Sequence, residues 1–425
     1  MWEFFKKRLK IFFYFQSMET LYFVILSIVV LFFIFDKIVD YLNTLHWSDT
    51  LPKEAEWIYD QEKYAKSQAY EKTKHTFSNY SGMISFLLTL LVLIFWGFWW
   101  LDEFLRQYIS GDIVLALTFF WVIIVLQILF WLPFSYYQTF VIEEKFGFNK
   151  MTKKLFFLDI IKSLLLTAII GWLLLAFIVW IYTMIGTHFW WVAFIALSLF
   201  SLFIMMFYST IIVPLFNKQT PLEPGELRDA IESFGKKVWF ELHEIYVIDG
   251  SKRSSKANAY FAWFGPKKRI VLFDTLISDL NTQELVAVLA HEIGHYKKKH
   301  TLQMLVFSIF QTGIILFLFS LIIDNREVAL ALWSTNPSFH IGAIAFGILF
   351  TPMSLVLSIG ANMLSRKNEY EADAYAKENY SGEALVSGLK KLSVNNLSNL
   401  LPHPVYEFVH YTHPTVLKRI KKLTK

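Results

Sequence analysis

Long apolar runs alternate with charged segments along most of this 425-residue chain. A run of about 20 apolar residues is long enough for a helix to cross a lipid bilayer. The pattern predicts seven such spans, at about residues 18–39, 83–100, 113–137, 155–184, 189–216, 301–323 and 339–364. We therefore expect a mainly α-helical integral membrane protein with seven transmembrane helices.

The first apolar run has no cleavage signal. It follows the basic residues Lys6, Lys7 and Arg8 and continues past Phe35 without the small residues of a signal-peptidase site. A secretory signal has a shorter apolar core and ends at such a site. The first span is therefore expected to remain in the mature protein.

Two polar segments, residues 217–300 and 365–425, are large enough to fold outside the bilayer. The chain therefore divides into four parts. Residues 1–216 hold spans one to five and their loops, and residues 217–300 form a first polar part. Residues 301–364 hold spans six and seven, and residues 365–425 form a second polar part.

The first polar part mixes helix and strand signals. A turn at 221–226 precedes an amphipathic helix that reaches about Phe234, and the segment 250–257 is predicted to be a flexible polar loop. Alternating apolar residues predict short strands, and Gly265-Pro266-Lys267-Lys268 is typical of a hairpin turn between the last two. The strands are Glu244–Asp249, Asn258–Phe264 and Arg269–Phe273. We expect a small β-sheet or hairpin here.

The segment His291-Glu292-Ile293-Gly294-His295 carries the clearest chemical signal in the chain. Histidines four apart on a helix lie on one face, so both rings can bind one metal ion. The glutamate beside the first histidine can then accept a proton from a metal-bound water. This is the arrangement of a zinc peptidase, with His291 and His295 as ligands and Glu292 as general base.

The residues before this motif are those of a buried helix. Asn281 and Glu284 have the spacing of a capping box, and an apolar run, Leu285–Ala290, follows them. A buried polar cluster needs partners, and a metal ion supplies them. The alternative, two idle histidines at a polar helix end, is the weaker interpretation.

A catalytic zinc needs a third protein ligand if the fourth position is to hold water. Some zinc peptidases take this ligand from a histidine further along, in the motif H-E-x-x-H-x-x-G-x-x-H. Here the position of that third histidine is Thr301, and His300 is one residue away from it, so this scheme is excluded. A second helix offers Glu369 and Asp373, which are four residues apart on one face. One carboxylate can bind the metal while the other orients a ligand histidine. Glu369 is favoured as the ligand over Glu371, which points away from that pair.

Composition narrows the chemistry further. Apolar residues make up 55% of the chain and aromatic residues 18%, which suits a membrane protein. Cysteine is absent, which excludes disulfides, a thiol nucleophile and cysteine-ligated metal. The net charge of +5 is ordinary for a membrane protein with basic cytoplasmic loops and gives no reason to expect nucleic acid as a partner.

Most of the 40 Lys and Arg residues lie on the side of the membrane that holds both polar segments. Basic residues favour the cytoplasm, so we expect the catalytic side and the C-terminus to be cytoplasmic. Within the fourth span, Asp159 and Lys162 share one helical face. They form either a structural ion pair or part of the lining of a polar cavity.

Several further motifs resemble the type I CAAX prenyl proteases, integral membrane zinc endopeptidases, and their bacterial relatives. The resemblance includes the stretches Leu132–Ser135, Phe140–Asn149, Pro214–Asn217, Asn258–Phe261 and Arg269–Thr275. It continues through the H-E-x-x-H motif, Ser365-Arg366 with Glu369, and His413-Pro414. The Phe140–Asn149 stretch is more specific than the zinc motif, which many peptidases share.

The resemblance implies a zincin-like catalytic domain and a role for each matching residue. His291, His295 and Glu369 would bind one Zn²⁺, and Glu292 would act on water. It further implies that Asp373 orients a ligand histidine. Asn258 and Tyr260 would lie on a strand that pairs with substrate. His413 and Arg419 would close the site, with His413 donating a hydrogen bond to the oxyanion. It also implies a barrel of seven helices around a water-filled chamber.

The expected substrates are the C-terminal ends of membrane-associated peptides or proteins, prenylated where the host makes prenylated proteins. The membrane would be that of the endoplasmic reticulum in a eukaryote and the inner membrane in a bacterium. Two alternatives remain at this point. One is a bacterial heat-shock-type membrane zinc protease, and the other is a non-enzymatic seven-span transporter or receptor with structural histidines.

Overall fold

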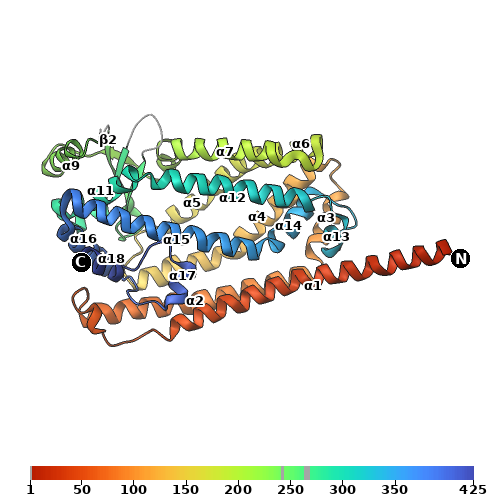
Figure 1. Cartoon of the computed structure of the whole chain (residues 1–425), viewed down its shortest axis with the longest axis horizontal. Coiled ribbons are helices and arrows are strands. Elements are labelled where there is room, and N and C mark those ends of the chain that lie inside the picture. The colour runs from red at the N-terminus through yellow and green to blue at the C-terminus, as the bar shows by residue number, and fades with distance from the viewer. Residues whose placement is uncertain (1, 241–243, 263–268) are drawn as a thin grey trace.

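The computed structural model describes residues 2–240, 244–262 and 269–425, with side chains at 20–240, 244–258 and 269–425. The molecule is an elongated helical bundle, and the C-terminus lies at one end of it (Figure 1). The N-terminal part of α1 extends from the opposite end. We call the end that holds the C-terminus the catalytic end and the other the distal end.

Five long helical stretches have the length and hydropathy of membrane spans. They are Thr20–Thr44 of α1 (Trp2–Thr44), α2 (Gln61–Ile94), Asp112–Glu143 with α4 (Asp112–Tyr137), Lys153–Phe216, and α12 (His300–Ile322). A sixth is the pair α14 (Phe339–Leu349) and α15 (Thr351–Ala376), bent by 59°. Pro352 near the start of α15 has no N–H for a helical hydrogen bond, which favours a break at this point.

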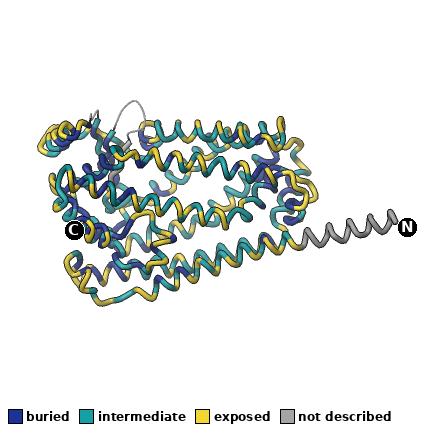
Figure 2. The backbone as a smooth tube through the Cα atoms, viewed as in Figure 1, coloured by how far each residue is buried: buried dark blue, intermediate teal, exposed yellow. Residues whose placement is uncertain are grey.

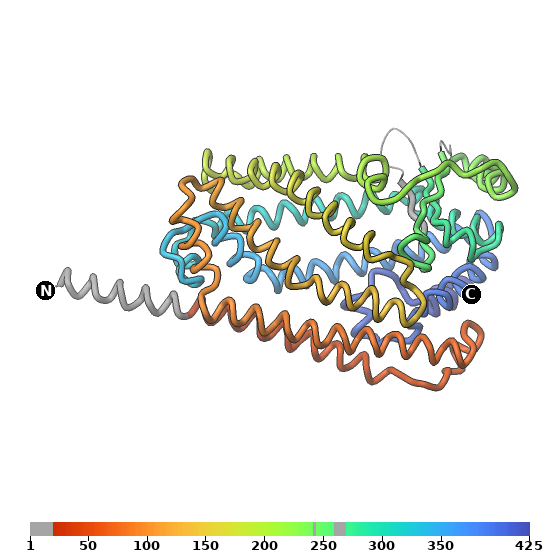
Figure 3. Tube along the Cα trace, turned by 180° about the vertical axis from the view of Figure 1, so that it is seen from behind, coloured from red at the N-terminus to blue at the C-terminus, as the bar shows by residue number. Residues whose placement is uncertain are grey.

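The stretch Lys153–Phe216 contains two passes. Its 64 residues would extend about 96 Å as one straight helix, roughly three times the thickness of a bilayer core. Gly186 has φ +57°, a conformation that favours glycine and ends α6. The helices on either side of Gly186 lie side by side (Figure 3). They are α6 (Trp172–Ile185), which continues from α5 (Lys153–Leu166), and α7 (Phe189–Phe207), which leads to α8 (Val213–Phe216). The seven predicted spans thus all have helical counterparts among the described residues.

Several predicted spans have different bounds in the structure, and the second differs most. The expected helix at 83–100 begins much earlier, at Gln61, and ends at Ile94. Trp96 adopts a left-handed conformation with φ 58°, so the chain turns before α3 (Gly97–Arg106) begins. Hydropathy alone could not find this break because the apolar residues continue through it.

The catalytic end holds the remaining polar structure. Its helices are α9 (Glu226–Lys237), α10 (Asp274–Asp279), α11 (Thr282–Lys297), α16 (Gly382–Asn395), α17 (Pro404–His410) and α18 (Val416–Leu423). The short helix α13 (Arg326–Ala331) lies at the distal end.

Four short strands form one sheet at the catalytic end, in the order β1-β2-β4-β3. They are β1 (Gln219–Pro221), β2 (Glu244–Ile248), β3 (Ala259–Ala262) and β4 (Arg269–Phe273). The strand β4 pairs in parallel with β2 and antiparallel with β3, so β3 is an edge strand. The sequence predicted β2, β3 and β4 but not β1, and the predicted hairpin turn at 265–268 lies outside the described residues.

Buried residues are concentrated at the two ends of the bundle (Figure 2). At the catalytic end, apolar side chains of the sheet pack against α9, α11, α16 and α18, with Ile270, Leu289 and Ile420 among them. In the middle of the bundle most side chains are half-buried or exposed, as expected for a segment that lies in lipid. The polar segments therefore form one packed core at the catalytic end.

Candidate metal centre and active site

The helix α11 begins at a complete capping box. The Asn281 side chain accepts a hydrogen bond from the Glu284 backbone N–H, and the Glu284 carboxylate accepts one from Asn281. Ser387 and Lys391 of α16 also donate to Glu284, and these hydrogen bonds lower its pKa despite burial. The predicted cap is thus confirmed, and it joins the start of α11 to α16.

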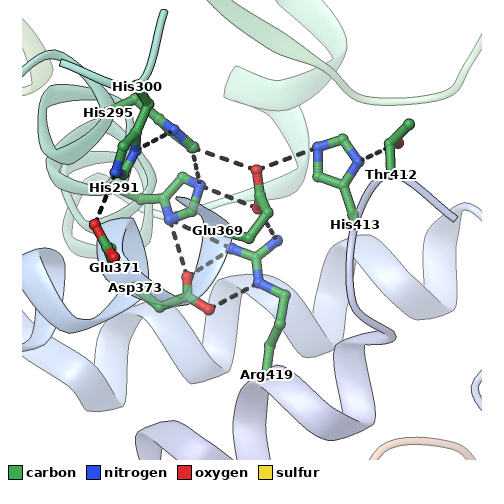
Figure 4. Close-up of polar contacts among 9 residues, drawn as sticks. All are labelled: His291, His295, His300, Glu369, Glu371, Asp373, Thr412, His413 and Arg419. Atoms are coloured by element: carbon green, nitrogen blue, oxygen red, sulfur yellow. Dashed lines mark hydrogen bonds and ion pairs between the residues drawn. The ribbon is translucent and has the colours of Figure 1, made fainter. Parts of the chain in front are cut away.

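Two histidines lie on one face of α11, one turn apart. His291 is buried, His295 is partly buried, and their Nε2 atoms are 3.1 Å apart. The helix α15 crosses this face closely because Gly294 has no side chain: a Cβ there would lie 3.1 Å from the backbone of Ala372. This close approach brings the buried Glu369 carboxylate to both rings (Figure 4).

The spacing of these three side chains fits a tetrahedral metal. Glu369 lies 3.5 Å from His291 Nε2 through Oε2 and 3.3 Å from His295 Nε2 through Oε1. Ligand atoms at zinc bond lengths and tetrahedral angles are about 3.3 Å apart, close to all three separations. His291, His295 and Glu369 also form the one candidate metal-binding group found among the described residues. The donor set leaves a fourth position free for water.

The Glu369 carboxylate is itself incompletely satisfied. Its Oε2 is buried and accepts no hydrogen bond, although Arg419 Nη1 lies 3.2 Å away as an ion pair. A buried polar atom without a hydrogen bond is costly, and a metal ion at this position removes that cost. The donor chemistry therefore agrees with the geometry.

Asp373 orients the first histidine. Its carboxylate lies 2.9 Å from His291 Nδ1, which leaves Nε2 directed at the metal position. Arg419 of α18 donates to both oxygens of Asp373 at 2.6 and 2.9 Å. Burial and the Arg419 charge lower the pKa of His291, but hydrogen bonds to Asp373 and Glu369 outweigh them and raise it to about 9. A metal ion must therefore displace a proton from this ring.

The second histidine is oriented by residues that the sequence analysis did not identify. His295 Nδ1 lies 3.0 Å from Nδ1 of the buried His300, whose Nε2 lies 3.1 Å from Glu371. Glu371 was predicted to be solvated, and its side chain is indeed 39% exposed, but it also contacts His300. No local signal links His300 to Glu371, because the two residues are 71 positions apart in the sequence.

A cavity of about 200 Å³ opens beside the three ligands. Glu292 lines it and is half-buried, as the general base of a water attack requires. His413 lines it from the segment before α18, with 62% of its side chain exposed. The His413 Nε2 atom lies 3.3 Å from Glu369, and Thr412 contacts Nδ1 at 2.9 Å. His413 thus faces the metal position from the side opposite the two histidines (Figure 4).

Asn258 lines the same cavity and directly precedes β3. Its carbonyl accepts a hydrogen bond from the Phe273 N–H, which continues the pairing with β4. Tyr260 lies on β3, but its side chain is outside the described residues. The other edge of β3 has no partner strand among the described residues. An extended peptide can pair with an edge strand of this kind.

The segment 250–257 is not the flexible loop that its polar sequence predicted. Arg253 donates to both oxygens of Asp159 at 2.8 and 2.9 Å, and Asn149 forms a β-bridge with Ser254. Lys256 contacts Glu143 at 2.8 Å and Tyr70 at 2.7 Å. Residues far apart in sequence hold this loop, and local composition could not reveal them.

Asp159 and Lys162 do not form the ion pair that was one of the two alternatives. Asp159 pairs with Arg253, whereas Lys162 donates to the Leu215 carbonyl at 2.8 Å. Asp159 also lines a cavity of about 460 Å³ between α4 and α5. The second alternative, a cavity-lining residue, therefore agrees with the structure for Asp159 but not for Lys162, and Asp159 forms its ion pair with Arg253.

Two family models together match nearly all of the chain from residue 40 onwards. Residues 40–218 match the family described as CAAX prenyl protease N-terminal, five membrane helices, and residues 221–425 match peptidase family M48. CAAX prenyl protease 1 of Saccharomyces cerevisiae is 37% identical over 92% of both chains. The human CAAX prenyl protease 1 homolog is 33% identical over 90% of both.

A solved structure agrees with the fold. The crystal structure of S. mikatae Ste24p matches with a TM-score of 0.90 and 35% sequence identity. The match covers 95% of this chain and 99% of that one. The similarity therefore extends over the membrane helices and the catalytic end together.

Proposed function

This chain belongs to the CAAX prenyl protease 1 family within peptidase family M48, and we propose that it removes C-terminal residues from prenylated proteins at the cytoplasmic face of its membrane. It is a multi-pass membrane zinc metalloprotease. The heat-shock-type protease and the non-enzymatic alternatives are set aside, because both halves of the chain match the prenyl protease relatives. The observation that carries the proposal is the metal-ligand triangle of His291, His295 and Glu369 beside a cavity lined by Glu292.

We assign the metal ligands and base as follows. His291, His295 and Glu369 hold one zinc ion, which when bound supplies Lewis acidity for an attacking water and for the peptide carbonyl. Glu292 takes the proton from that water and delivers it to the leaving amine nitrogen. Asp373 and Arg419 keep His291 in the tautomer whose Nε2 binds metal.

The substrate is held and polarised by other groups around the cavity. The open edge of β3, which follows Asn258, pairs with an extended substrate backbone and aligns one peptide bond with the metal. His413 donates to the carbonyl oxygen as negative charge develops on it. The zinc ion, when bound, and His413 would therefore both stabilise the negative charge on the carbonyl oxygen.

The orientation follows from the charge distribution. Basic residues of the catalytic end favour a cytoplasmic location, and the eukaryotic relatives favour the endoplasmic reticulum membrane. An accessibility tag after Lys425 should therefore be modified from the cytoplasm, and a tag at the N-terminus from the lumen. A lumenal C-terminal tag would contradict the proposed topology.

The substrate class is tested with two peptides that differ only in their cysteine. The purified protein should cleave a farnesylated CAAX peptide with a kcat/KM at least tenfold above that of the unmodified peptide. Activity should disappear with a chelator and return with zinc. Equal cleavage of both peptides would show that the enzyme does not recognise the prenyl group, and the protein would then be a general membrane endopeptidase.

A further inference from the structure

An elongated groove lies between α4 and α5, separate from the zinc site. Its volume is about 460 Å³, and its lining extends from Ile128 of α4 to Thr139 just after that helix, and from Phe156 of α5 to Thr167 just after that one. A rise over eleven helical residues corresponds to about 16 Å.

Aromatic side chains pack against one another next to this groove, and Phe156 is one of its lining residues. Phe156 packs against Phe140 and Tyr136 at the catalytic end, with ring centroids 5.4 and 5.9 Å apart. Beyond the other end of the lining, Trp121 of α4 and Trp172 of α6 pack together with ring centroids 5.4 Å apart. Along the chain, the residues that line the groove lie between these two aromatic contacts.

The lining combines apolar walls with a few polar groups. Trp131, Leu132 and Ile160 contribute apolar surface, and Ser135 and Ser163 contribute hydroxyls. Polar side chains of membrane helices seldom face lipid and usually turn to the protein interior. We infer that the groove faces the inside of the bundle and not the surrounding lipid.

The groove is connected to the substrate-binding strand. Asp159 of its lining holds Arg253, which precedes Asn258 by only five residues. Five residues of chain extend at most about 17 Å, so the catalytic end of the groove lies within that reach of the zinc-site cavity. Asn258 lines that cavity, and the β3 edge begins directly after it.

We propose that the groove between α4 and α5 binds the isoprenoid chain of the substrate's prenylated cysteine while β3 holds its backbone. The inference rests on the proposed function. An extended farnesyl chain is about 15 Å long from standard bond lengths, close to the roughly 16 Å of helix that the lining covers. Burial of an apolar chain of this size against Trp131 and Ile160 supplies binding energy that an unmodified peptide lacks.

The test compares two phenylalanine variants of α5. Ser163→Phe fills the groove, whereas Ile161→Phe changes an exposed residue two positions away that does not line it. In lipid nanodiscs, Ser163→Phe should raise KM for a farnesylated peptide at least tenfold and leave KM for the unmodified peptide unchanged. Ile161→Phe should change neither, and both variants should retain one zinc per chain.

A second measurement does not depend on these variants. A farnesylated peptide with a photoreactive isoprenoid, bound to the full-length wild-type protein, should cross-link to tryptic peptides from α4 and α5. Excess farnesylated peptide should abolish the labelling. Trp172→Ala, which removes one ring of the Trp121–Trp172 pair beyond the lining, should lower KM for a geranylgeranylated peptide relative to a farnesylated one.

Failure of the groove assignment can be distinguished from failure of the proposed function. A KM that rises equally for both peptides in Ser163→Phe, or cross-links confined to other helices, would overturn the groove assignment while the proposed function stands. A wild-type protein that shows no preference for the farnesylated peptide would instead overturn the prenyl part of the proposed function.

Discussion

Two His–Asp–Arg clusters with buried His–Asp pairs lie at opposite ends of the bundle, and among the described residues only one of them belongs to a candidate metal centre. At the catalytic end, His291 contacts Asp373 at 2.9 Å, and Arg419 donates to both carboxylate oxygens. At the distal end, His340 contacts Asp102 at 2.8 Å, and Arg106 lies 3.0 Å from both oxygens. The polar chemistry of the two clusters is nearly the same.

The difference lies in what faces the second ring nitrogen. His291 Nε2 faces His295 and Glu369, and a cavity opens beside them. His340 Nδ1 is buried without a hydrogen-bond partner, and the Phe119 ring lies 4.6 Å from the imidazole. The distal cluster joins α3 to α14 and contributes no metal-binding group among the described residues. A buried histidine–aspartate pair therefore becomes a reactive site only where further ligands converge and substrate can enter.

The largest effect is expected from Glu292, which has no counterpart in the distal cluster. Glu292→Gln should lower kcat by about a thousandfold or more, because a neutral amide cannot take a proton from water. Zinc content, measured by atomic absorption, should remain at one per chain. Loss of zinc from the folded variant would contradict the assignment of Glu292 as a base that acts only on water.

His413 tests whether the open side of the catalytic cluster contributes to the reaction. His413→Ala should lower kcat about a hundredfold, because a donor to the developing oxyanion contributes on the order of 3 kcal/mol. Zinc content and KM should change little. Unchanged cleavage in this variant would leave His413 as only the residue before Pro414.

Matched asparagine variants separate the two clusters directly. Asp373→Asn should lower zinc affinity by about 10–100-fold, because the orientation of His291 weakens. Asp102→Asn should leave zinc affinity and kcat unchanged and lower the free energy of unfolding by about 3 kcal/mol, since it disrupts a buried ion pair. Thermal unfolding and chelator competition measure the two effects. Loss of zinc from Asp102→Asn would contradict the view that the distal cluster has only a structural role.

The pH dependence of zinc binding tests the proton on His291. Its pKa of about 9 in the metal-free protein means that zinc competes with a proton below that pH. Zinc affinity should therefore rise about tenfold per pH unit as pH increases towards 9 and level off above it. Competition with a chelator of known pH dependence measures this slope. A flat profile between pH 6 and 8 would contradict the raised pKa.

The smallest effect is expected from the support of the second ligand. His300→Ala and Glu371→Gln should each lower zinc affinity by up to about tenfold and leave KM unchanged, because His295 keeps its place on α11. Lys367→Ala, a neighbour of Glu371 without contact to His300, is the control. A loss of zinc as complete as that of Glu369→Ala would instead make Glu371 a metal ligand.

Local sequence was sufficient for the features that depend on periodicity and spacing. The apolar runs identified the helices that cross the membrane, because a bilayer admits few alternatives to them. The four-residue spacing of His291 and His295, and of Glu369 and Asp373, placed each pair on one face of a helix. The capping box at Asn281 was likewise a local pattern, and the structure confirms it.

Tertiary packing decided what those local patterns face. The partner of Asp159 is Arg253, 94 residues away, and not its near neighbour Lys162. The loop at 250–257 is held by contacts with residues as distant as Tyr70, and no local signal records them. Because Gly294 has no side chain, α15 can approach α11 closely. This approach brings Glu369 of α15 to the two histidines of α11, so that residues from two helices form one candidate metal site. The sequence by itself determined which residues can bind zinc. Only packing between distant helices decided that these residues meet, because side chains far apart in sequence come together through contacts that have no local periodicity.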